Sequence, residues 1–276
     1  MENSMEKVAY LGPDGTFSHM AAIDLYGESA SFHPADTIED VFALVERDSC
    51  STGVVPVENS YEGSVNITLD LFYKYDLKIC AETYVRIRHH LLSMEGNIRD
   101  IKKIYSHPMA LAQCRLWLRA NMNGVPVAEV SSTSLAAGIA AEESGSAAIG
   151  NRALEELYGL KILNEDIEDH PDNMTRFLAI GKKRTSSMGK DKTSILFFLH
   201  DRPGALHKAL GALAERGINI TRIESRPMKT RNWEYLFFMN IEGHEQDVKI
   251  NDALKEMEKQ CVLLKRLGSY PKGKED

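Results

Sequence analysis

The stretch DNMTRFLAIG, residues 172–181, joins polar side chains to an apolar run and predicts a buried strand with a polar mouth. Thr175, Arg176 and Phe177 place a hydroxyl, a fixed cation and an aromatic ring side by side, which suits a small aromatic acid with a carboxylate and a leaving hydroxyl. The same residues also fit a plain strand start, with Asp172 or Asn173 as a turn residue and a solvated arginine. The polar residues 182–192 that follow predict a linker, and therefore a domain boundary.

Before this boundary, short apolar strands alternate with helical patterns. We expect strands at 8–11, 54–57, 104–106 and 147–150, and helices at 16–26, 109–119 and 152–158. Alternation of this kind is typical of an α/β sheet covered by helices on both faces. Ligands of such sheets bind beyond the carboxyl ends of the strands, where polar loops gather.

After the boundary, the pattern is strand, helix, strand, strand, helix, strand. We expect these elements at 194–199, 205–216, 218–224, 234–241, 247–260 and 262–267, with a turn at 229–232. A βαββαβ unit of this size indicates a ferredoxin-like arrangement. Its helices would cover one face of the sheet, and its edge strands would be open to pairing.

Composition and motifs exclude several classes of protein. A chain of 276 residues with a net charge of -7 favours two domains and argues against a nucleic-acid partner. The apolar runs are too short to span a membrane, and residues 1–7 contain no signal-peptide core. Four scattered cysteines fit a reducing cytoplasm. Neither a nucleotide-binding glycine motif nor a His/Cys metal cluster is visible, so we expect no cofactor and no metal.

Four polar motifs are candidate parts of a site, and each also has a structural interpretation. YLGPDGTFS (10–18) opens a helix whose N–H groups attract anions, although Thr16 or Ser18 could simply cap that helix. PVENSYEGSV (56–65) puts a carboxylate, an amide and a hydroxyl after a strand, and it also fits a surface turn.

In SHPM (106–109), with Gln113 one turn later, His107 could carry a proton or pack in the turn. SSTS (131–134) could bind a carboxylate at a helix N-terminus, and it could equally supply one ordinary cap.

In this order and at these separations, the motifs resemble one family, the monofunctional prephenate dehydratases with a C-terminal ACT regulatory domain. AAIG (147–150), GALH (204–207) and ESRP (224–227) extend the match, which covers about residues 8–271. Met109 departs from the pattern, since the family usually has Gln there, and any polar contact from that position is lost or moved. Leu213 replaces a common aromatic residue, and Asp14 replaces a common Glu.

The resemblance implies a fold and an activity. It implies a two-lobed, periplasmic-binding-protein-like α/β catalytic domain at 1–181, a linker at 182–192 and a ferredoxin-like ACT domain at 193–276. The implied reaction is the decarboxylating dehydration of prephenate to phenylpyruvate, water and CO2, a carbon–oxygen lyase step of phenylalanine biosynthesis. L-phenylalanine would bind the ACT domain and lower activity, in a homodimer or homotetramer.

Candidate site residues follow from the motifs and the resemblance. Thr175 would act on the leaving hydroxyl of the substrate. Arg176 would bind the pyruvyl carboxylate, because a tight ion pair with the departing ring carboxylate would oppose its loss. Phe177 would form an apolar wall, with a core position as the alternative. The remaining candidates are Thr16, Glu58, Asn59, Ser60, Gly63, Ser106, Gln113, Ser132, Thr133 and Asn151 for the substrate, and Gly204, Ala205, Leu206, His207, Glu224, Ser225, Arg226 and Pro227 for the effector.

Three alternatives remain at this point. The two-lobed region could be a solute receptor without chemistry, although no signal peptide is visible. The chain could be an ACT sensor, which would not need the 172–177 segment. Arogenate could replace prephenate as the substrate, although no transit peptide is visible to favour it.

Overall fold

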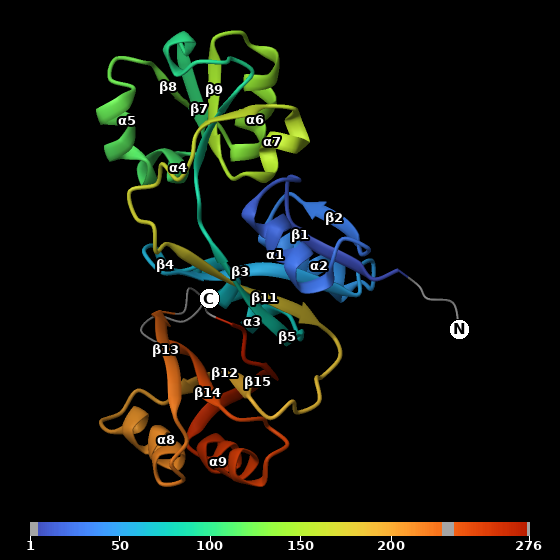
Figure 1. Cartoon of the computed structure of the whole chain (residues 1–276). Helices are drawn as coiled ribbons and strands as arrows, with labels where there is room; N and C mark the ends of the chain where they lie inside the picture. The colour runs from blue at the N-terminus through green and yellow to red at the C-terminus, as the bar shows by residue number, and fades with distance from the viewer. Residues whose placement is uncertain (1–4, 228–234, 275–276) are drawn as a thin grey trace.

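The structure is a computed structural model that describes residues 5–227 and 235–274 (Figure 1). Three β-sheets organise these residues, one in each of two α/β lobes and one in a C-terminal unit. In Figure 1 the second lobe (green), the first lobe (blue) and the C-terminal unit (orange to red) follow one another from top to bottom. The turn expected at 229–232 lies outside the described residues. None of the described helices has the length and apolar character needed to cross a lipid bilayer.

The first lobe contains a six-stranded sheet in the order β2-β1-β3-β11-β5, with the short β4 paired to β3. Strands β1, β2 and β3 run parallel, whereas β11 returns from the second lobe and pairs antiparallel with β3 and β5. The elements of this lobe are β1 (Lys7–Leu11), α1 (Phe17–Tyr26), β2 (Ser31–Ala35), α2 (Ile38–Glu46), β3 (Thr52–Asn59), β4 (Gly63–Ser64), α3 (Asn66–Lys74), β5 (Lys78–Arg86) and β11 (Met174–Gly181).

The second lobe contains a five-stranded sheet in the order β10-β6-β9-β7-β8. Every residue of its central strand β9 is buried, as expected for a strand covered on both faces. The elements are β6 (His90–Ser93), η1 (Ile98–Asp100), β7 (Lys103–Ser106), α4 (Pro108–Gln113), α5 (Arg115–Asn121), β8 (Val127–Glu129), α6 (Thr133–Glu142), β9 (Ser146–Gly150), α7 (Ala153–Tyr158) and β10 (Lys161–Asn164).

The single helix expected at 109–119 is instead the pair α4 and α5, with a break at Cys114. Asp169 explains the break, because its carboxylate accepts the backbone N–H of Leu116 at 3.0 Å and also that of Trp117. These two bonds satisfy N–H groups that a continuous helix would have used internally. A residue 52 or more positions away therefore ends the predicted helix early.

The chain passes between the two lobes at 87–89 and again at 165–173. The two passages are bonded to each other, since the N–H of Ile87 donates to the carbonyl of Asn173 at 2.8 Å. The Glu168 carboxylate also reaches back to the first passage, where it accepts a backbone N–H at 2.9 Å. Two adjacent, bonded passages give the lobes a common hinge.

The C-terminal unit confirms the predicted βαββαβ order. Its antiparallel sheet has the order β13-β14-β12-β15. Its elements are β12 (Asp191–Leu199), α8 (Ala205–Ala214), β13 (Ile220–Pro227), β14 (Tyr235–Glu242), α9 (Val248–Glu258) and β15 (Cys261–Pro271). Helices α8 and α9 cover the face that carries Ile195 and Phe197.

The opposite face of this sheet packs on the first lobe. Leu196 and Phe238 belong to the same buried core as Phe42 and Phe72 of the first lobe. The contact is so close that a Cβ on Gly268 would lie 2.5 Å from a backbone oxygen of β5. The C-terminal unit and the first lobe therefore share one hydrophobic core.

The predicted linker extends to residue 192, but β12 already begins at Asp191. Asp191 is buried, and its carboxylate accepts the N–H groups of Met188 and Gly189, which offsets the cost of burial. Lys192 is buried as well, and its ammonium is paired with the carboxylate of Glu82 at 2.8 Å. The polar character of these two residues reflects a buried junction and not a solvated linker.

Candidate active site

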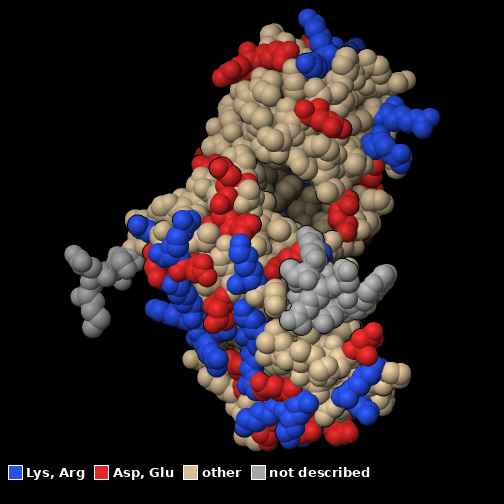
Figure 2. Space-filling view, turned by 180° about the vertical axis from the view of Figure 1, so that it is seen from behind, with Lys and Arg blue, Asp and Glu red and all other residues tan. Residues whose placement is uncertain are grey.

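A cavity of about 580 Å³ lies between the two lobes. Figure 2 shows a hollow between the upper lobe and the rest of the molecule, with mostly neutral walls and acidic residues near its rim. The first lobe contributes the start of α1, the β3–β4 hairpin and the mouth of β11, and the second lobe contributes the starts of α4 and α6. The predicted site residues that line the cavity are Thr16, Asn59, Gly63, Gln113, Ser132, Thr133 and Thr175.

Thr175 presents its hydroxyl to this cleft from β11, opposite Asn59 on β3. The Nδ2 of Asn59 donates to the Oγ1 of Thr175 at 2.9 Å. The carboxamide of Asn59 cannot turn around without loss, because its Oδ1 accepts the N–H groups of Tyr61 and Glu62, both at 2.9 Å. The Thr175 oxygen therefore accepts a bond, and the hydroxyl proton can be donated into the cleft.

The electrostatic character of the cleft comes from helix ends and neutral donors. The described residues that line it include neither Lys nor Arg, and Glu62 is their one carboxylate. Helices α1 and α6 both start at the cleft, where their N-termini favour negative charge. Thr16 and Ser132 cap these helices through their side-chain oxygens, so each of them both caps a helix and lines the cleft.

His89 lines the cleft and was not among the predicted site residues. Its Nε2 lies 2.9 Å from the Oε1 of Gln113, and its ring packs edge-on against Phe17. Burial lowers the pKa of His89, so the ring is neutral near pH 7. A neutral ring with its hydrogen on Nε2 occupies the amide oxygen of Gln113 and leaves the NH₂ group of Gln113 to donate. His89 and Gln113 meet because the chain passes between the lobes at 87–89, and this segment carries no recognisable sequence motif.

Met109 and His107 also line the cleft, at the start of α4. His107 caps this helix, since its Nδ1 accepts the N–H of Met109 at 3.2 Å. The Met109 side chain is exposed to the cleft, so the departure noted in the sequence puts a thioether where the family pattern has an amide.

Three predicted substrate residues hold the scaffold and do not line the cavity. Ser106 is fully buried and donates to a backbone carbonyl of β9 at 2.6 Å. Asn151 is buried as well and donates to the carbonyl of Gly15 at 2.7 Å, which ties the second lobe to the first. Ser60 accepts the N–H of Met174 at 3.0 Å and so secures the mouth of β11.

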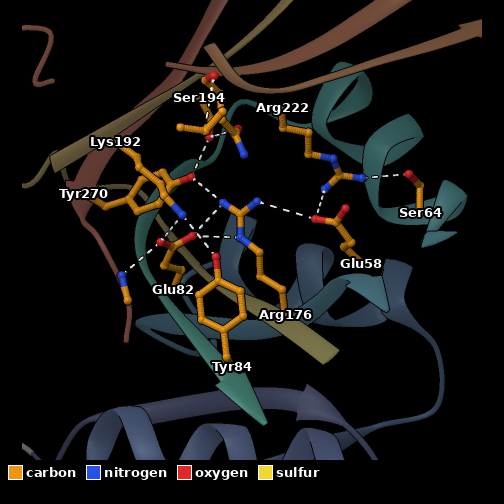
Figure 3. Close-up of polar contacts among 12 residues, drawn as sticks. Glu58, Ser64, Glu82, Tyr84, Arg176, Lys192, Ser194, Arg222 and Tyr270 are labelled. Atoms are coloured by element: carbon orange, nitrogen blue, oxygen red, sulfur yellow. Dashed lines mark hydrogen bonds and ion pairs between the residues drawn. The ribbon is translucent and has the colours of Figure 1, made fainter. Parts of the chain in front are cut away.

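Arg176 does not face the cleft, which contradicts its predicted role as a carboxylate clamp. Its side chain is 5% exposed, and Figure 3 shows it pointing toward Glu82 and Tyr270. Its Nε donates to Glu82 at 2.7 Å, and its Nη2 donates to the Tyr270 hydroxyl at 3.0 Å. Burial by itself would lower the pKa of Arg176, but Tyr270 and Glu82 raise it above its usual value.

Strand geometry explains the correction. Successive side chains of a strand point to opposite faces of the sheet, so Thr175 and Arg176 cannot both border one cleft. The face that carries Arg176 meets the C-terminal unit, where Lys192 also pairs with Glu82 at 2.8 Å. Glu58 lies on this face too, opposite Arg176 in the register, and is not among the residues that line the cavity.

Phe177 is a core residue, which contradicts the apolar-wall role and agrees with the alternative. It is 2% exposed and packs with Val8, Tyr10, Ala22 and Val54 under α1. Phe177 and Leu178 still alternate, since Phe177 packs under α1 and Leu178 packs toward the C-terminal unit; the register shift between Arg176 and Phe177 falls in the partner strand β3.

The two predicted effector motifs lie at the same end of the C-terminal sheet. Phe198, Leu236 and Arg226 stand in one row across β12, β14 and β13, and the chain leaves β12 there toward the 204–207 motif. Gly204 has a φ of 78°, which favours glycine, and it is the N-cap of α8. The Arg226 side chain faces the first lobe, with its Nε 3.5 Å from Asp70 on α3.

Comparisons with known proteins bear on both halves of the chain. The prephenate dehydratase family profile matches residues 8–185, and the ACT domain profile matches residues 193–259. The bifunctional chorismate mutase/prephenate dehydratase of Aquifex aeolicus is 50% identical over 266 residues, which cover 96% of this chain and 74% of that protein. The prephenate dehydratase of Methanocaldococcus jannaschii is 42% identical over 273 residues, which cover 96% of this chain and 97% of that protein.

Among solved structures, the prephenate dehydratase of Arthrobacter aurescens in complex with L-Phe superposes with a TM-score of 0.88. It is 34% identical, and the match covers 96% of this chain and 90% of that chain. The predicted architecture, two α/β lobes followed by an ACT domain, is thereby confirmed.

Proposed function

The chain belongs to the prephenate dehydratase family, and we propose that the cleft between its two lobes carries out the family's reaction. That reaction is a carbon–oxygen lyase step in L-phenylalanine biosynthesis. Prephenate loses its ring carboxylate as CO2 and its ring hydroxyl as water, and phenylpyruvate remains. The electron pair of the broken C–C bond enters the ring as the C–O bond breaks, and one proton joins the departing oxygen.

Thr175 is the group that meets the departing oxygen. The observation that carries this assignment is the bond from Asn59, which occupies the Thr175 oxygen and leaves its proton to donate. A positioned proton donor typically contributes 10²- to 10⁴-fold, or about 3–5 kcal/mol of the barrier. Gln113, held by His89, offers its NH₂ group from the opposite wall.

None of the described residues that line the cleft offers a cationic side chain to the two carboxylates of the substrate. The N-termini of α1 and α6, with the hydroxyls of Ser132 and Thr133, offer N–H and O–H donors to them. Neutral donors of this kind suit the carboxylate that leaves, because they do not stabilise its ground state as strongly as an arginine would.

The test is an assay with prephenate at neutral pH, in which phenylpyruvate formation is followed. Wild type should turn over, Thr175→Ala should lose about 10²- to 10⁴-fold in kcat, and Thr175→Ser should stay within about tenfold of wild type. If Thr175→Ser lost as much as Thr175→Ala, proton donation would not explain the residue. A chain that binds prephenate without turning it over would be a receptor. Arogenate, in a parallel assay, distinguishes the two substrates by kcat/KM.

L-phenylalanine is the proposed effector, since the Arthrobacter aurescens relative was solved with L-Phe. The proposed site joins the 204–207 and 224–227 motifs at their common end of the sheet. The start of α8 offers backbone N–H groups to the amino-acid carboxylate. Calorimetry with L-phenylalanine, and with D-phenylalanine as the control, tests this site. Equal heats for the two enantiomers would contradict a specific one.

The remaining parts of the proposal concern organisation. The catalytic domain would span 1–181, the linker would be shortened to 182–190, and the regulatory domain would start with β12 and span 191–276. A homodimer or homotetramer would form along β13, a terminal strand of its sheet. Light scattering measures this state directly, and a monomer at working concentration would contradict it. The four cysteines are free, in keeping with a proposed cytoplasmic location.

A further inference from the structure

Arg222 of β13 reaches from the regulatory sheet into the catalytic lobe (Figure 3). Its Nη1 lies 2.9 Å from the Oε2 of Glu58, which makes an ion pair without the alignment of a hydrogen bond. Its Nη2 donates to the Oγ of Ser64 at 2.7 Å. One guanidinium therefore holds both strands of the β3–β4 hairpin, in which Glu58 and Ser64 are directly paired.

This hairpin carries the group that orients the catalytic hydroxyl. Asn59 follows Glu58 in β3, and the N–H groups of the hairpin turn, at Tyr61 and Glu62, fix its carboxamide. That carboxamide in turn donates to Thr175. Ser64 itself lines the cleft. A displacement of the hairpin would therefore move the donor that sets the Thr175 hydroxyl.

The arginine of this bridge is buried, and the Glu58 carboxylate is half-buried. The Arg222 side chain is 9% exposed, and its guanidinium lies over the ring of Phe238 in the shared core. Burial lowers the pKa of Arg222, and the Glu58 charge opposes that shift. Glu58 also lies 3.8 Å from the Nη1 of Arg176, so two guanidinium groups from different domains meet at one carboxylate.

We propose that Arg222 is a positioning residue that transmits the position of β13 to the Asn59–Thr175 pair. It stands two residues before the 224–227 motif, so an effector that shifts this strand also shifts the guanidinium. The inference rests on the proposed function and names the physical link between its two sites. Arg222 acts through Glu58 and Ser64 and does not line the cleft itself.

The first test compares kinetic constants and the response to L-phenylalanine. Arg222→Met should lower kcat by about 10-fold with KM within about threefold, because a transition-state contact is loosened while substrate binding is kept. The residual activity should respond to L-phenylalanine by less than about twofold, against the 5- to 150-fold typical of coupled sites. By calorimetry, the variant should bind L-phenylalanine at least as tightly as wild type does. The Arg222 bridge opposes the shift of β13 that the effector causes, and the variant lacks this bridge. Arg222→Lys should recover only part of kcat, because lysine lacks the planar fork that places one guanidinium nitrogen on Glu58 and another on Ser64.

The matched control is Lys265→Met. Lys265 of β15 also crosses the domain boundary, where it donates to the carbonyls of Phe72 and Tyr75, away from the hairpin. This variant should lose stability but keep the response to L-phenylalanine. If it lost the response as Arg222→Met does, general weakening of the interface would be the cause, and the proposal would be overturned.

A double-mutant cycle and amide exchange complete the test. The effects of Arg222→Met and Glu58→Gln on kcat should not multiply, because both remove the same bridge; effects that multiply would overturn the proposal. Hydrogen exchange of residues 59–65 should rise in Arg222→Met, with the second lobe unchanged. Hydrogen exchange does not depend on turnover. It therefore tests the Arg222 bridge even if wild type does not convert prephenate and the proposed function is wrong. Unchanged exchange of the hairpin would overturn the inference alone.

Discussion

Asn59 and Thr175 face each other across antiparallel strands, and the 2.9 Å bond from Nδ2 to Oγ1 decides which way the threonine proton points. The bond depends on the hairpin turn, whose N–H groups hold the amide oxygen of Asn59. The proposed catalytic hydroxyl is therefore oriented by the N–H groups of Tyr61 and Glu62, which act through Asn59, a residue 116 positions away in the sequence.

Asn59→Asp tests this orientation, because it keeps the acceptor for the turn but replaces the Nδ2 donor to Thr175, Asn173 and Met174 with a negatively charged acceptor. The new carboxylate should accept a hydrogen bond from the Thr175 hydroxyl, which then no longer points toward the substrate. The value of kcat should fall about 100-fold, within the range expected for loss of a proton donor. Steady-state kinetics with prephenate measures the effect. A kcat within threefold of wild type would show that the hydroxyl direction is not limiting.

Arg176→Met separates a structural arginine from a substrate clamp. The variant leaves Glu82 with Lys192 as its remaining cationic partner in a buried site, so the free energy of unfolding should fall by about 3 kcal/mol. The KM for prephenate should change by less than about threefold, because Arg176 does not line the cleft. Urea unfolding measures the free energy of unfolding. Steady-state kinetics, at a temperature well below the unfolding transition, measures KM. A large rise in KM with unchanged stability would restore the clamp.

Ser132→Asp distinguishes helix capping from anion binding at α6. Aspartate caps helices as well as serine does, so the free energy of unfolding should change by less than about 0.5 kcal/mol. The added charge would face a substrate carboxylate, and KM should rise about 10-fold, the effect of about 1.4 kcal/mol of repulsion.

The control for this change is Asn97→Asp, which adds the same charge at the N-cap of η1, outside the cleft. It should leave KM unchanged. If both variants raised KM equally, the cause would be the net charge of the protein and not the helix end.

Three histidines, His19, His89 and His90, have pKa values lowered chiefly by burial. Below the usual histidine pKa of about 6.5, the unfolded chain binds protons that the folded chain does not. The free energy of unfolding should therefore decrease as the pH falls from about 6.5 toward the lower folded values, by at most about 1.4 kcal/mol per pH unit for each group.

Urea unfolding of wild type and His89→Gln between pH 7.5 and pH 5.5 measures this slope. Glutamine can still donate to Gln113 but does not titrate, so the variant should show a shallower decrease. An identical slope in the two proteins would assign the pH dependence to other groups.

Much of this protein could be read from the sequence by itself. The βαββαβ order of the C-terminal unit, the alternation of the lobes and the family follow from hydrophobic periodicity and from motifs in a fixed order. Thr175, Asn59 and Gln113 are also found in the cleft as predicted. The alternation of side chains along a strand also predicts that Thr175 and Arg176 point to opposite faces of the sheet.

Only the tertiary structure decided which face of β11 borders the cleft. The regulatory sheet packs on the other face, so Arg176 is buried and Glu58 is half-buried at a junction between domains, whereas the motifs predicted that both contact substrate. His89 lies in the site because the chain passes between the lobes at this point. Asp169 breaks the helix predicted at 109–119, although it is far from that helix in the sequence. Local patterns specify which residues alternate and where helices begin, whereas the partner that covers each face depends on contacts between segments far apart in the chain.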